Sequence, residues 1–128
     1  MIIGWKWFNE KDDPLIVGLD PQLISMLDMA RDKAGIPFVI TSGKRTAQQE
    51  AELKGGVKDS THLLGLAVDL ECNVDNALCL MLKGLFAAGF RRIGLYHDAL
   101  FQPRHLHVDI GPMPDYPQDC MWLKLEEN

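Results

Sequence analysis

Two short stretches of this chain place ionisable side chains among apolar ones, and they constrain its fold more than any other feature. In the first, 58–70 (KDSTHLLGLAVDL), His62 and Asp69 stand seven positions apart on either side of Gly65. In the second, 104–110 (RHLHVDI), histidines and a carboxylate alternate with aliphatic residues. Burying such groups without a partner costs several kcal/mol each, so we expect the fold to bring them together.

The alternation in the second stretch predicts a strand whose polar side chains, His105, His107 and Asp109, share one face. Two imidazoles and a carboxylate can hold zinc and leave a fourth position for water, which is the pattern of a catalytic site. The histidine and aspartate of the first stretch can reach the same point if the chain turns at Gly65. A shared metal ion in a metallohydrolase is the favoured interpretation, and merely structural histidines are the alternative.

The remaining sequence predicts a mixture of helices and strands. Asp20 and Pro21 form a typical N-cap and first-turn proline for a helix over 20–34. Similar patterns predict further helices over 46–54 and 74–88, and strands over 38–41, 66–70, 91–96 and 104–110. Because these elements lack a regular βαβ alternation, we expect an α+β fold with a small antiparallel sheet flanked by helices.

Several details of these elements can be compared with a structure. Thr46 and Gln49 form a capping box for the second helix, Asn73 is the expected cap of the third, and 38–41 should be a buried strand. The aromatic segment 1–8 should form a lid strand or an extended segment packed on the core. An apolar patch at the end of the chain, 121–125, is assigned to no element. The side chains that the third helix should bury are Leu78, Met81, Leu82, Leu85 and Phe86.

Charge and length limit the kinds of partner. The 128 residues carry a formal net charge of -5 and contain no run of Lys or Arg. Nucleic acids and anionic membranes bind positively charged surfaces, so the expected partner is a small molecule or a peptide, with no nucleic acid and no membrane. No apolar run approaches the roughly 18 residues that a membrane-spanning helix needs. This length is typical of one domain, and we expect a single domain over 1–128 and a monomer.

Three motifs resemble those of a known family. The run 60–69 resembles the SxHxxGxAxD signature of the zinc D-alanyl-D-alanine carboxypeptidases, a family that includes the L-alanyl-D-glutamate peptidases of phage endolysins. The HLH of 105–107 resembles the HxH motif that this family shares with lysostaphin-type peptidases and the hedgehog domain, and 41–46 (TSGKRT) resembles its SGxR turn. The resemblance covers nearly the whole chain and implies a hedgehog/D-Ala-D-Ala peptidase-like fold.

The resemblance also implies roles for individual residues. His62, Asp69 and His107 would bind zinc, with water in the open position. Arg45 would bind the substrate carboxylate or polarise the scissile carbonyl, which suits its planar guanidinium. His105 would handle the proton or stabilise the oxyanion without binding the metal.

Weaker expectations concern four further residues. Asp109 is a candidate acceptor that orients a metal-binding imidazole. Ser60 is a candidate hydrogen-bond partner of the substrate or a turn cap, and Tyr96 is a candidate for lining the cleft. Where several family members carry a Glu or Asp general base, three residues before the last zinc histidine, this chain has Arg104. His105 is the obvious replacement.

Taken together, these residues predict a zinc-dependent metallopeptidase that hydrolyses a bond of the peptidoglycan stem peptide. Carboxypeptidase action on D-Ala-D-Ala and endopeptidase action within the stem both remain open. No signal peptide or wall-binding module is recognisable, so we expect a protein made in the cytoplasm that acts on the cell wall after release, as a phage or prophage lysin does. The alternatives are a non-catalytic zinc-containing binding module and a phage structural component of the same fold.

Overall fold

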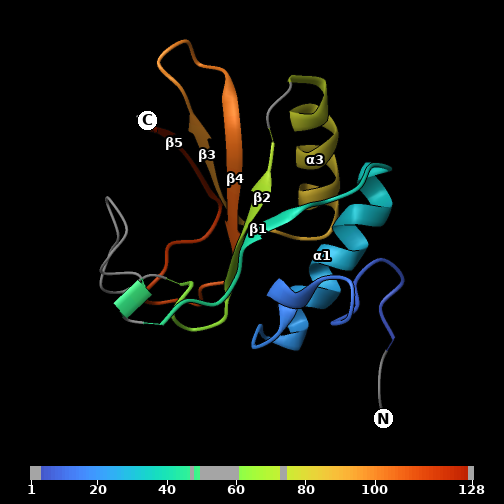
Figure 1. Cartoon of the computed structure of the whole chain (residues 1–128). Coiled ribbons are helices and arrows are strands. Elements are labelled where there is room, and N and C mark those ends of the chain that lie inside the picture. The colour runs from blue at the N-terminus through green and yellow to red at the C-terminus, as the bar shows by residue number, and fades with distance from the viewer. Residues whose placement is uncertain (1–3, 47, 50–60, 73–74, 127–128) are drawn as a thin grey trace.

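The computed structural model describes residues 4–46, 48–49, 61–72 and 75–126. Within these residues it contains two long helices, one 3-10 helix and a five-stranded sheet (Figure 1). The elements are η1 (Pro14–Ile16), α1 (Pro21–Ala34), β1 (Ile40–Ser42), β2 (Ala67–Glu71), α3 (Asp75–Ala87), β3 (Arg92–His97), β4 (Pro103–Asp109) and β5 (Cys120–Leu125). The α+β class is confirmed.

The sheet has the strand order β1-β2-β4-β3-β5, and it is mixed rather than antiparallel. The first four strands pair antiparallel, but β5 pairs parallel to β3. The reason lies in the segment 110–119, which carries the chain from the end of β4 past β3. Strand β5 therefore begins beside Arg92, where β3 itself begins, and both strands run the same way. The expected small antiparallel sheet is correct for four strands and wrong for the fifth.

Both helices lie side by side on one face of the sheet (Figure 1). Helix α1 begins and ends as predicted: the Asp20 side chain accepts a 2.8 Å hydrogen bond from the Gln22 N–H, and Gly35 ends the helix with a φ of 74°. Its apolar stripe packs on α3 and on the aliphatic side chains of the central strands. The fully buried members of this core include Leu23, Leu27, Ala30, Val68, Leu70, Leu85, Leu106 and Val108.

Helix α3 buries the predicted face except for Phe86, with Leu78 and Leu82 partly buried against the core, and it contacts α1 through a glycine. Met81 and Leu85 are buried as expected, but Phe86 is 55% exposed. Gly84 is buried instead, and a Cβ added there would collide with the carbonyl oxygen of Ala30. The two helices approach so closely that only a residue without a side chain fits, which rotates Phe86 away from the core.

We expect Gly84→Ala to lower the free energy of unfolding by about 1–3 kcal/mol, because the added methyl group must push the helices apart. In an unobstructed helix interior the same change would stabilise the protein by about 1 kcal/mol, so the sign of the effect is diagnostic. Urea denaturation measures it, with Lys83→Ala on the exposed side of α3 as the control. A variant more stable than the wild type would contradict the close contact.

Two of the predicted elements differ in detail from those in the structure. The strand expected over 38–41 is β1 at Ile40–Ser42, and it is an edge strand in which Thr41 is exposed, so it is not buried on both faces. Residues 4–8 form no strand but lie on α1, where the Trp7 N–H donates to Asp28 at 2.6 Å and the Trp5 indole to Ser25 at 3.0 Å. The expectation of an extended segment packed on the core holds for buried Phe8.

Parts of the remaining predictions fall outside the described residues. The capping box is confirmed, since the Thr46 N–H donates to the Gln49 side chain and the Gln49 N–H to the Thr46 hydroxyl. Most of the helix over 46–54 and the Asn73 cap lie outside the described part of the chain. In the part that is described, none of the helices has the length and apolar character needed to cross a membrane.

Candidate metal centre

The face of the sheet opposite the helices carries the candidate ligands. Asp69 on β2 and His107 on β4 are directly opposed in the antiparallel register, and His62 lies in the turn that leads into β2. One ligand atom from each of these side chains lies within 4.8 Å of the other two. The three residues are between 2% and 9% exposed. The structure thus brings together the three residues that were predicted to bind metal.

The turn between His62 and Asp69 depends on Gly65, as expected. Gly65 has a φ of 72°, and its N–H donates to the His62 carbonyl at 3.3 Å. Its own carbonyl accepts from the Asp20 N–H at 2.9 Å. A Cβ at this position would lie 2.6 Å from the Gly18 carbonyl oxygen, so glycine is required sterically as well. This turn is therefore fixed against the start of α1, and it places His62 beside β2.

The imidazole of His62 is oriented by a backbone carbonyl. Its Nδ1 lies 2.8 Å from the Gly43 carbonyl oxygen, which can only accept, so Nδ1 carries a hydrogen. In the neutral ring Nε2 is then an unprotonated acceptor. This nitrogen lies 3.2 Å from Oδ1 of Asp69.

The imidazole of His107 is oriented the opposite way by a carboxylate. Its Nε2 lies 2.7 Å from Oδ2 of Asp109, which leaves Nδ1 facing Oδ1 of Asp69 at 3.3 Å. Asp109 thus occupies the place that was expected of an orienting acceptor. Two imidazole nitrogens and a carboxylate oxygen therefore converge, an arrangement that a cation between them would stabilise.

Two of the three ligand spacings match those around a tetrahedral metal ion. Ligands bound to zinc at about 2.0–2.1 Å lie roughly 3.3–3.4 Å apart along a tetrahedral edge. The two nitrogen-to-oxygen distances, 3.2 and 3.3 Å, are close to that value. The donor set of two imidazoles and one carboxylate is also the one that zinc favours in catalytic sites. The residues present therefore fit the predicted metal.

The electrostatics of the centre favour a positive charge. Burial opposes ionisation of Asp69, but hydrogen bonds from His107 and His62 outweigh it and hold the pKa of that carboxyl well below its usual range. Burial likewise lowers the pKa of His107, but Asp109 and Asp69 outweigh it and raise that pKa above its ordinary value. A metal ion supplies the same positive charge without protonation of the imidazole.

We expect the affinity for Zn²⁺ to fall as the pH is lowered through the pKa of His107. Metal binding requires the neutral imidazole, and a raised pKa lets protons compete at a higher pH than for an ordinary histidine. The affinity should be constant above that pKa and decrease by up to tenfold per pH unit for each proton displaced. Competition titrations with a chelator at several pH values measure this, and a Kd that is constant from neutral to acidic pH would contradict it.

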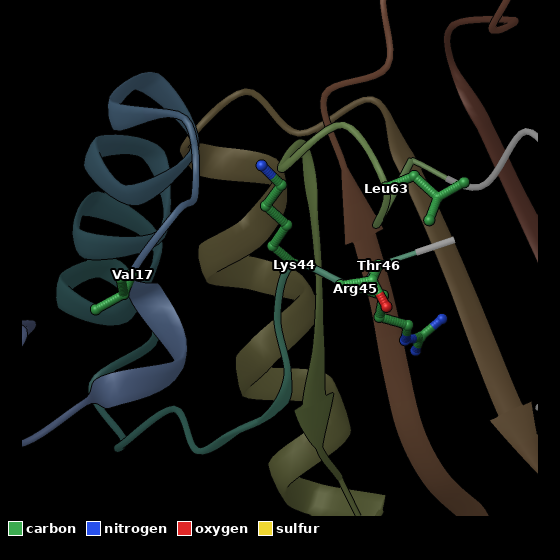
Figure 2. Close-up of a pocket in the computed structure, with 5 residues that line it drawn as sticks. All are labelled: Val17, Lys44, Arg45, Thr46 and Leu63. Carbon is green, nitrogen blue, oxygen red and sulfur yellow. The ribbon is translucent and has the colours of Figure 1, made fainter. Parts of the chain in front are cut away.

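Arg45 leaves the corner after β1 and reaches the same centre. Its Nη2 lies 2.9 Å from Oδ2 of Asp69, its Nε donates to Ser42 at 3.1 Å, and its backbone N–H donates to the His62 carbonyl. Figure 2 shows its side chain projecting away from that of Lys44. A pocket of about 490 Å³ lies along this corner, lined by Val17, Lys44, Arg45, Thr46 and Leu63.

His105 lies on the same face of β4 but outside the three-residue cluster. Its ring stacks on Tyr96 with the ring centres 4.3 Å apart, and its Nδ1 lies 3.6 Å from Oε2 of Glu126. Burial, followed by the negative charge of Asp69, raises the pKa of the Tyr96 hydroxyl. Tyr96 thus belongs to the surroundings of the centre. The remaining candidate, Ser60, lies outside the described residues.

Sequence reasoning missed the residues that β5 contributes. Glu126 follows this strand, and Trp122 on it lies against His107, with the ring centres 5.6 Å apart. A Cβ at Gly94 would collide with the indole, so the glycine makes room for it. The signal was present: Met121, Leu123 and Leu125 alternate with other residues, which is the period of a strand.

Comparison with known proteins gives the family. A model of the peptidase M15 family matches residues 8–109 of the 128. The chain belongs to the peptidase M15 family. The resemblance found in the sequence motifs is thereby confirmed, and the chain is a metallopeptidase. Among the described residues of this M15 peptidase, His62, Asp69 and His107 form the candidate metal site.

One solved structure supports the fold of this M15 peptidase. The crystal structure of the Serratia marcescens L-Ala D-Glu endopeptidase ChiX is similar with a TM-score of 0.54 and 18% sequence identity. The match covers 79% of this chain and 88% of that one. No curated protein sequence matches the M15 peptidase described here.

Proposed function

We propose that this M15 peptidase is zinc-dependent and hydrolyses a peptide bond in the stem peptide of peptidoglycan. The observation that carries the proposal is the convergence of two imidazole nitrogens, one each from His62 and His107, on one oxygen of Asp69, at 3.2 and 3.3 Å. The substrate class is supported by the structural neighbour from Serratia marcescens, which is an L-Ala D-Glu endopeptidase. The motifs at 60–69 and 105–107 favour the same class.

His62, Asp69 and His107 would hold the zinc. When bound, zinc would polarise the scissile carbonyl and lower the pKa of a water molecule toward about 7. The protein contributes the orientation of both imidazoles, through the Gly43 carbonyl and the Asp109 carboxylate. Because these partners are fixed before substrate arrives, the centre needs little rearrangement during the reaction.

Arg45 is the residue that would hold the substrate. Its guanidinium has five donors in a planar fork, and Asp69 and Ser42 hold it with its side chain only 16% exposed. Its guanidinium is therefore placed where it can bind a substrate carbonyl or carboxylate beside the metal. The pocket along Val17 and Leu63 would receive the part of the peptide that extends beyond Arg45.

His105 is the residue that would move the proton. It stands two positions from His107 on the same face of β4, and its Nδ1 faces the Glu126 carboxylate at 3.6 Å. Glu126 would stabilise the imidazolium that forms when His105 takes a proton, which it then gives to the leaving amine. The Glu126 carboxylate reaches His105 from the end of β5. On β4 itself, Arg104 stands where several family members have an acidic residue.

Digestion of purified peptidoglycan tests the proposal. The zinc-loaded protein should release fragments that mass spectrometry identifies. Free D-alanine would assign a carboxypeptidase, and new termini within the stem peptide would assign an endopeptidase. The His107→Ala variant, purified in the same way, controls for contaminating hydrolases. If the zinc-loaded protein released neither product from peptidoglycan of several chemotypes, the proposed substrate would be wrong.

A further inference from the structure

We infer that Arg92 is a positioning residue for the metal centre, and that it acts through Asp109 on the imidazole of His107. The inference rests on the proposed metal site and adds to it a role for the segment that follows β4. Arg92 is the first residue of β3, and its side chain lies on the same face of the sheet as His107. It does not touch the ligand atoms themselves.

Asp109 divides its two oxygens between the metal centre and Arg92. Oδ2 faces Nε2 of His107 at 2.7 Å, whereas Oδ1 accepts from Nε of Arg92 and, at 2.9 Å, from the N–H of Gly111. The Asp109 side chain is 0% exposed, so no solvent competes for these positions. A buried carboxylate needs a compensating charge and filled hydrogen-bonding positions, and Arg92 supplies both.

Arg92 is itself fixed by the segment between β4 and β5. Its Nη1 donates to the Pro117 carbonyl at 2.7 Å, and its guanidinium carbon lies 5.3 Å from the centre of the Tyr116 ring and 5.4 Å from that of Trp122. The side chain is only 12% exposed. These anchors all lie beyond residue 109, where the match to the family model ends. The C-terminal segment thus sets the position of Arg92, and through it that of Asp109.

The position of Asp109 determines where the His107 lone pair points. The imidazole is rigid, so the direction of Nδ1 follows from the hydrogen bond made by Nε2. A carboxylate free to rotate would let the ring turn away from Asp69. Loss of such an orienting partner typically lowers metal affinity by about 10- to 100-fold.

The neighbouring arginine provides a matched control. Arg91 also forms a two-pronged ion pair, with Asp119, but these side chains are 53% and 72% exposed and contact none of the ligand residues in the structure as described. Exposed ion pairs contribute little to stability. Removing the Arg91 side chain therefore tests the loss of an arginine–aspartate pair without a change at the metal centre.

The experiment is a competition titration of Zn²⁺ against a chromophoric chelator, together with the visible spectrum of the Co²⁺-loaded protein. Arg92→Met should weaken Zn²⁺ binding by about 10- to 100-fold and alter the Co²⁺ bands. Arg91→Met should match the wild type in both measurements. Arg92→Lys keeps the charge but loses the fork, so its affinity should lie between those of the wild type and Arg92→Met. A folded Arg92→Met protein with wild-type Zn²⁺ affinity and Co²⁺ spectrum would overturn the inference.

A second variant keeps the test decisive if Arg92→Met fails to fold. Asp109→Asn retains the shape of the side chain and places a neutral amide between Arg92 and His107, so it should also weaken Zn²⁺ binding. Unchanged affinity in Asp109→Asn would overturn the inference. Because the measured quantity is metal affinity, a wild-type protein that binds Zn²⁺ but leaves peptidoglycan intact would refute the proposed substrate and not the role of Arg92.

Discussion

Replacing His62 or His107 with alanine should remove the bound metal and abolish peptide hydrolysis. Each imidazole supplies one of the three donor atoms of the cluster, and an alanine leaves two, too few for a stable zinc site. The metal contributes several kcal/mol to the stabilisation of transition-state charge, so kcat/KM should fall by at least about 10³-fold. Zinc content by elemental analysis and hydrolysis of peptidoglycan by mass spectrometry measure the two losses.

The control for this result is His97→Gln. His97 is also a buried histidine of the sheet, but its Nδ1 contacts the Asp98 carbonyl and its ring stacks on Phe101, away from the cluster. This variant should retain one zinc per chain and wild-type hydrolysis. Full zinc content in His62→Ala would show that the metal is bound elsewhere.

Replacing His105 with alanine should separate metal binding from catalysis. The variant should keep its zinc, because His105 lies outside the three-residue cluster, and should lose activity by about 10²- to 10⁴-fold, the usual contribution of general acid–base catalysis. Glu126→Gln should lose less, because the histidine stays in place and only its charge partner changes. Zinc content and kcat/KM, measured on the same preparations, distinguish these effects.

Two outcomes would redirect the mechanism. Full activity in His105→Ala would mean that another group moves the proton, and Tyr96, stacked on that ring, would become the next residue to test. Loss of zinc in His105→Ala would mean that the residue supports the metal rather than the proton transfer. Wild-type activity in Glu126→Gln alone would remove only the charge partner from the mechanism.

The metal cluster was predicted from local patterns together with the family resemblance, which singled out His62, Asp69 and His107 among the polar residues of the two stretches. Gly65 between His62 and Asp69 already indicated a turn that would let both side chains reach one point, and its φ of 72° agrees with that. The alternation in β4 likewise indicated which side chains share a face with His107. Burial of several ionisable groups on apolar strands then indicated a shared ion, and the family resemblance indicated which of these groups bind it.

The contributions of distant segments could not be predicted in this way. The direction of β5 depends on how the segment 110–119 passes the end of β3, and no local pattern encodes that path. The close contact at Gly84 depends on Ala30 of another helix, so the apolar pattern of α3 missed this buried glycine and wrongly predicted that Phe86 is buried. The nearness of Glu126 to His105 follows from the parallel strand that was not foreseen.

The division of the Asp69 oxygens has a consequence for the choice between metal ions. Arg45 holds Oδ2 at 2.9 Å, so Oδ1 alone faces the imidazoles of His62 and His107. A carboxylate held in this way offers one oxygen and not two. Calcium prefers six to eight oxygen ligands and often a bidentate carboxylate, whereas zinc accepts a single oxygen beside two nitrogens. The ion pair with Arg45 therefore favours a small, tetrahedrally coordinated cation such as zinc and disfavours calcium.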